Sequence, residues 1–279
     1  MSDTPIYDLK NGKPHPFHIL RPSAWPLLSA LAAGSLAVGA LVYMHAPAAW
    51  REMGIGWTAL ILGFLAVIAV MWGWWRDVIH EGYVEKAYTE EVRTGMRWGM
   101  ALFIASEVMF FFAFFWVFFG SSIFPKEAIG FTWPPKDITP IKPFDLPLLM
   151  TMVLLLSGCA VTWAHHEILE NKKDLVVKGL EIAVGLGVFF TILQVYEYHH
   201  ADFAFKSGIF ASTLYMTTGF HGFHVIVGTI FLAVCLYRAK QEHFTPKGHV
   251  GFESAAWYWH FVDVVWLFLF AAMYWWGGG

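Results

Sequence analysis

Long apolar stretches with few or no charged side chains alternate with short polar connections along the whole chain. Seven such stretches are visible, and a helix needs about 20 apolar residues to cross the hydrocarbon core of a membrane. The pattern therefore predicts an all-α polytopic membrane protein with seven transmembrane helices. The expected spans are residues 24–44, 55–75, 97–121, 146–166, 174–198, 208–237 and 253–276.

The polar connection at residues 76–96 divides this predicted membrane domain, which covers residues 1–279. We expect a two-helix N-terminal unit at 1–75, an inside connecting segment at 76–96 and a five-helix bundle at 97–279. Of the 18 Lys and Arg residues, 13 fall on one predicted side of the membrane and five on the other. The positive-inside rule then predicts that the N-terminus lies inside and the C-terminus outside.

Composition narrows the function classes. Hydrophobic residues make up 57% of the chain and charged residues only 14%, against roughly 25% charged in globular domains, which excludes a soluble domain. The net charge of −3 and the lack of a basic run with interleaved aromatics give no sign of a nucleic-acid partner.

Thirteen histidines raise the question of a metal or haem site. The predicted topology places His165 and His166 at the opposite membrane face from His199 and His200, roughly 30 Å away, so these two pairs cannot share a site. Adjacent histidines on a helix also point about 100° apart, which makes each pair a poor chelate. We therefore expect no metal site, and interfacial hydrogen bonding for these four residues.

A second group of polar residues falls inside the predicted spans. His221 and His224 share one helix face, and Glu107 and Asp263 lie about 15 Å into their own spans, at a similar depth. His260 lies one turn before Asp263. An isolated ionised carboxylate at that depth is costly, so protonation or pairing is expected. The group is either a functional site or a set of neutral groups that hydrogen-bond between helices.

The sequence lacks the residues that several classes of membrane protein require for their cofactors. A retinal protein needs a lysine in the last span, a membrane di-iron enzyme needs several histidine boxes, and a dinuclear copper site needs paired cysteines, none of which this sequence has. Two alternatives stay open. One is a b-haem subunit that uses His221 or His224 with His260, although the surrounding sequence is Phe-rich. The other is a proton or small-ion transporter, although broken helices and inverted repeats are not apparent.

Several strings resemble the haem-copper oxidase subunit III family, that is cytochrome c oxidase subunit III, nearly end to end. They are WWRDVI at 74–79, LFIASEV at 102–108, WPP at 133–135, TWAHH at 162–166, TGFHGFHV at 218–225 and GFESAAWYWHFVDVVWLF at 251–268. The resemblance implies a core subunit of an aerobic terminal oxidase that has no catalytic residue, haem or copper of its own. Haem a and copper are then expected in subunits I and II, with subunit I as the main contact.

The resemblance also implies roles for individual residues. Glu107 matches the buried carbodiimide-reactive carboxylate of the family, and members of the family sustain proton uptake and protect the oxygen-reducing site from inactivation during turnover. They also bind phospholipids. Location in a bacterial cytoplasmic or a mitochondrial inner membrane is implied, with a larger respiratory supercomplex as a further partner. The expected lipid-binding residues are Trp75, Arg76, Glu81, Arg238 and His243.

Overall fold

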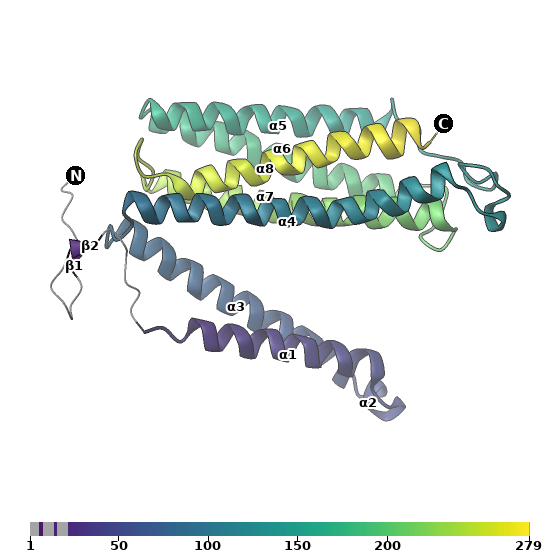
Figure 1. Ribbon diagram of the computed structural model, residues 1–279, viewed down its shortest axis with the longest axis horizontal. Helices are drawn as coiled ribbons and strands as arrows, with labels where there is room; N and C mark the ends of the chain where they lie inside the picture. The colour runs from purple at the N-terminus through teal and green to yellow at the C-terminus, as the bar shows by residue number, and fades with distance from the viewer. Residues whose placement is uncertain (1–5, 8–13, 16–21, 279) are drawn as a thin grey trace. The chain divides into compact units, whose positions relative to one another are not determined.

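A computed structural model describes residues 6–7, 14–15 and 22–278 of the chain (Figure 1). The chain forms two compact units, Met1–Gly95 and Met96–Gly279. Within the described residues, seven helices are long and apolar enough to cross a membrane, which confirms the predicted all-α class and the number of spans. The orientation of the termini stays a prediction.

The first unit is a helical hairpin preceded by a minimal strand pair. Strands β1 (Ile6–Tyr7) and β2 (Pro14–His15) pair antiparallel, with Ile6 opposite His15. Helix α1 (Trp25–His45) is followed by the single-turn α2 (Ala48–Glu52) and then by α3 (Ile55–Tyr83). In Figure 1, α1 and α3 lie side by side and α2 lies at the turn between them.

Glycines set the distance between α1 and α3. A Cβ atom added at Gly39 would lie 2.6 Å from the carbonyl oxygen of Ala59, and one added at Gly63 would lie 2.6 Å from the Cα of Leu36. Both distances are too short for any side chain. Because lipid removes the hydrophobic drive for helices to associate, such close backbone approach is a main source of packing energy in membranes.

The second unit is a bundle of long helices. Helix α4 (Glu90–Ile123) begins within the last residues of the first unit, and a 3₁₀ turn, η1 (Glu127–Ile129), follows it. Helices α5 (Leu146–Leu169), α6 (Lys173–His200), α7 (Ile209–Lys240) and α8 (Val250–Leu269) come next, and α8 continues into the π-helix η2 (Phe270–Trp276).

The helices are longer than the predicted spans, mainly at their charged ends. Helix α3 continues to Tyr83 and α4 begins at Glu90, although the apolar pattern places the ends of these spans at 75 and 97. Charged residues mark where the hydrocarbon core ends, and they do not stop a helix. The connection expected at 76–96 is therefore largely helical.

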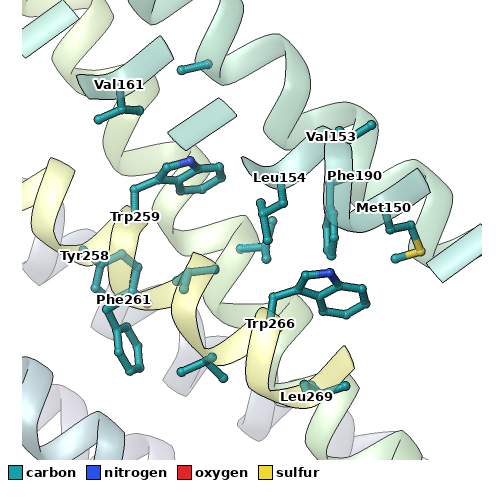
Figure 2. Close-up of a cluster of buried hydrophobic side chains, with 14 of the residues drawn as sticks. Met150, Val153, Leu154, Val161, Phe190, Tyr258, Trp259, Phe261, Trp266 and Leu269 are labelled. Carbon is teal, nitrogen blue, oxygen red and sulfur yellow. The ribbon is translucent and has the colours of Figure 1, made fainter. Parts of the chain in front are cut away.

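The core of the second unit is built around two tryptophans of α8 (Figure 2). The indole of Trp259 occupies a slot beside Gly187 of α6 and Gly228 of α7, where a Cβ atom would lie 2.8 Å from the ring in both cases. Its Nε1 donates to the hydroxyl of Ser157 at 3.1 Å. Nε1 of Trp266 donates to the hydroxyl of Thr151 at 2.9 Å. Both indoles therefore hydrogen-bond to α5, so neither leaves a polar group unpaired in the core.

Candidate functional site

Glu107 of α4 and His224 of α7 form a polar pair inside the second unit. Oε2 of Glu107 lies 2.9 Å from Nε2 of His224, and the two side chains are 22% and 8% exposed. The apolar, aromatic run of α4 carries the carboxyl group into the bundle, and the ring of Phe111 packs edge-on against His224 with centroids 5.0 Å apart. The pair is thus shielded by aromatic rings.

The other hydrogen bond of His224 determines how this pair holds its protons. Nδ1 of His224 lies 2.6 Å from the backbone carbonyl oxygen of Phe220, which can only accept, so Nδ1 carries a hydrogen. A neutral His224 then has a lone pair at Nε2, facing the carboxyl oxygen of Glu107. A hydrogen bond between these atoms requires one added proton, either on Glu107 or on His224. The pair of Glu107 and His224 therefore shares one proton.

His221 does not join this pair. It is fully buried, and its Nε2 donates to the backbone carbonyl oxygen of Val262 at 3.1 Å. Within the described part of the chain its Nδ1 has no hydrogen-bond partner. This arrangement describes a neutral imidazole that ties α7 to α8.

His260 and Asp263 form a second, separate contact on α8. Nδ1 of His260 lies 3.5 Å from Oδ2 of Asp263, and Nε2 of His260 lies 3.1 Å from the hydroxyl of Thr162 on α5. Gly158 makes room for the carboxyl group, because a Cβ atom there would clash with Oδ2 of Asp263. The five polar residues that the sequence singled out thus occupy three places, and the described residues show no hydrogen bond between those places.

Three of the expected lipid-binding residues lie in the first unit. Trp75 is 59% exposed and Arg76 is more exposed still. The guanidinium of Arg76 is 3.2 Å from the carboxylate of Asp77, while Glu81 accepts a hydrogen bond from Tyr88 at 3.4 Å. The surface at this end of α3 therefore offers one accessible cation beside an aromatic ring.

The other two lie just beyond α7 and at its end. The guanidinium of Arg238 sits 4.7 Å above the ring of Phe244. Burial, and then the charge of Arg238, lower the pKa of His243 below 6.5, so its imidazole is neutral at neutral pH. Of these two residues, only Arg238 contributes positive charge.

Glu197 is a buried carboxyl group that the sequence did not point to. Glu197 of α6 is 4% exposed, and its Oε1 accepts a hydrogen bond of 2.6 Å from the hydroxyl of Tyr274 in η2. The apolar run that precedes Glu197 ends at Tyr196, so the sequence predicts that Glu197 lies at the polar end of a span. The helix continues to His200, and this continuation places Glu197 inside the bundle.

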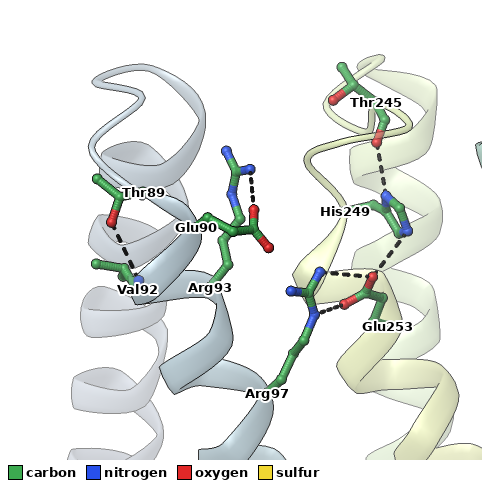
Figure 3. Close-up of polar contacts among 8 residues, drawn as sticks. All are labelled: Thr89, Glu90, Val92, Arg93, Arg97, Thr245, His249 and Glu253. Atoms are coloured by element: carbon green, nitrogen blue, oxygen red, sulfur yellow. Dashed lines mark hydrogen bonds and ion pairs between the residues drawn. The ribbon is translucent and has the colours of Figure 1, made fainter. Parts of the chain in front are cut away.

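An ionic cluster between α4 and the start of α8 was also missed (Figure 3). Arg97 of α4 donates from Nε and Nη2 to the carboxylate of Glu253 at 2.7 and 3.2 Å. His249 lies one helical turn before Glu253, with Nε2 3.3 Å from Oε1. The spacing of four residues between His249 and Glu253 was the one visible signal, since a helix brings i and i+4 to the same face.

Comparison with known proteins places the chain in a family. The sequence profile of the family described as cytochrome c oxidase subunit III matches residues 15–278. Cytochrome c oxidase subunit 3 of Chondrus crispus is 52% identical over 269 residues, covering 96% of this chain and 97% of that protein. The proteins of that name from Marchantia polymorpha and Cyprinus carpio are 52% and 48% identical, each covering at least 94% of this chain and 97% of the relative.

Proposed function

The chain belongs to the cytochrome c oxidase subunit III family, and on that premise we propose that it supports proton uptake, holds phospholipid and stabilises the catalytic subunit during turnover. Membership makes it an integral membrane subunit of an oxidoreductase complex of the respiratory chain, with other oxidase subunits as partners.

The observation that carries the proposal is the pair of Glu107 and His224. It is a proton-holding group among aromatic rings, at a position that the sequence places inside a membrane span. Ionisable groups inside a membrane are costly and mark functional positions by default. A pair that shares one proton supports a role in proton uptake. Such a role requires no redox centre in this chain.

The proposed setting follows from charge and family. The N-terminus lies inside and the C-terminus outside, subunit I is the main contact and subunit II a further one, and these two hold haem a and copper. The membrane is a bacterial cytoplasmic or a mitochondrial inner membrane, and a respiratory supercomplex is a further partner. Apolar side chains exposed along α4, such as Leu102, Met109 and Trp116, supply surface for lipid and for the neighbouring subunits.

Phospholipid binding is proposed for the exposed cation of Arg76 and the partly buried cation of Arg238. A basic group near a membrane surface attracts an anionic headgroup with about 1 kcal/mol, which is roughly a fivefold change in affinity. Arg76→Gln and Arg238→Gln should therefore each lower the amount of co-purified anionic phospholipid, as measured by mass spectrometry. Unchanged lipid in the double variant contradicts this part of the proposal.

A depletion experiment tests whether the chain supports the reaction or carries it out. Purified complex with and without the chain is compared for haem content and for the initial rate of oxygen consumption. The proposal predicts unchanged haem content and a largely preserved initial rate. Immediate loss of all activity with full haem content would show that the chain itself supplies catalytic chemistry.

A further inference from the structure

We propose that His165, His249 and Glu253 form a binding site for a single zinc ion, which links the end of α5 to the start of α8. One ligand atom from each residue lies within 4.8 Å of the other two, and no other group of this kind occurs among the described residues. His165 comes from α5, His249 caps the start of α8, and Glu253 lies in its first turn. The inference does not depend on the function proposed above.

The distances match tetrahedral coordination. Nε2 of His165 lies 3.3 Å from Nε2 of His249, which in turn lies 3.3 Å from Oε1 of Glu253. Ligand atoms at the usual zinc distances of 2.0–2.1 Å are about 3.3 Å apart in a tetrahedron. Two of the three edges already have this length. The third, between His165 and Glu253, needs a side-chain movement of at most about 1.5 Å.

The protonation of His249 directs a lone pair into the site. Its Nδ1 lies 2.9 Å from the backbone carbonyl oxygen of Thr245, which only accepts, so Nδ1 carries the hydrogen (Figure 3). In the neutral imidazole, Nε2 then has a lone pair that faces both the other imidazole and the carboxylate. Metal-binding histidines are oriented by this kind of backbone contact.

Three ligand atoms that converge in this way can bind a single cation. In the absence of metal, a neutral His165 with its hydrogen on Nε2 can donate to Nε2 of His249. Two imidazole nitrogens and one carboxylate oxygen favour zinc over magnesium or calcium, which prefer all-oxygen sites. The fourth position is left for water. Arg97 already binds the carboxylate of Glu253, so it neutralises part of the charge and makes the site weaker than a closed structural site.

Access from water is open on one side. His249 is 6% exposed, while His165 and Glu253 are only partly buried, at helix ends next to the polar loop between α7 and α8. An ion can therefore enter and leave without opening the core. A bound zinc ion would add a metal link between two helices that meet here through the 3.3 Å contact of His165 with His249 and the ring contact of His165 with Phe252.

Zinc binding to the purified oxidase complex tests the site. The complex is stripped with a chelator and titrated with Zn²⁺ by equilibrium dialysis, for the wild type and for His165→Asn and His249→Asn. His166→Asn is the matched control, because His166 is the exposed neighbour that pairs with Glu170. The two site variants should each lose one zinc equivalent, with affinity at that site reduced by more than about 100-fold. The control should keep it.

Equal zinc binding by the wild type and both site variants would overturn the proposal. A second measurement needs no variant, in case the substitutions prevent assembly. Crystals of the wild-type complex soaked in Zn²⁺ should show anomalous density at the zinc edge between the Nε2 atoms of His165 and His249. Density at other positions of the complex but not at this one would likewise overturn it.

Discussion

Replacing Glu107 tests how the pair with His224 holds its proton. In a neutral pair the carboxyl O–H donates to Nε2 of His224, and the side-chain amide of Glu107→Gln can donate in the same way over the same distance of 2.9 Å. Glu107→Gln should therefore cost less than about 1 kcal/mol. Glu107→Ala leaves the buried Nε2 of His224 without a donor and should cost about 1–3 kcal/mol.

An ion pair between Glu107 and His224 predicts a different ranking of the two variants by stability. If His224 carried the charge, Glu107→Gln would remove the partner of a mostly buried cation, at a cost of about 3–5 kcal/mol. Denaturant-induced unfolding of the chain in detergent micelles, extrapolated to zero denaturant, measures these differences for both variants. A glutamine variant as unstable as the alanine variant would refute the neutral pair. Loss of the infrared C=O band of a protonated carboxyl in both variants provides a separate check.

Two further predictions use the same unfolding titration. Gly228→Val should destabilise the chain by about 1–3 kcal/mol because the new side chain meets the ring of Trp259, whereas Gly185→Val, with nothing within 4 Å of its Cβ position, should not show this clash. Hydrogen bonding to Lys172, and then its charge, hold the pKa of Glu170 below 4.5. Such a pair stabilises the folded chain above that pH and loses its effect as the pH falls through the lowered pKa, so Lys172→Gln should lower stability at neutral pH and not in acid.

The existence of the helices could be predicted from the sequence, because a long apolar run in a membrane must pair its own backbone hydrogen-bonding groups, and an α-helix does so. Their ends could not, as Glu197 illustrates. A charge marks the edge of the apolar run, while α6 continues for another turn because backbone hydrogen bonds continue beyond the apolar residues. The sequence therefore predicts the depth of a residue in the membrane only where that residue lies well inside a span.

Pairing between helices was predictable in part. The depth of Glu107 and of His224 put both at one level, but depth does not say which way a side chain points around its helix. The structure brings Glu107 to His224 and leaves His221 on a backbone carbonyl. His165 and His249 are 84 positions apart, so no local pattern indicates that they meet.

The course of oxygen consumption over many turnovers tests the central claim most directly, namely that this chain is a supporting subunit of the oxidase. Complex depleted of the chain is compared with the same preparation after the purified chain has been added back. We expect that the depleted complex starts at a similar rate, then loses activity progressively, and that adding back the chain restores sustained turnover. Identical time courses for the depleted and restored complexes, with the chain shown to be bound again, would contradict it.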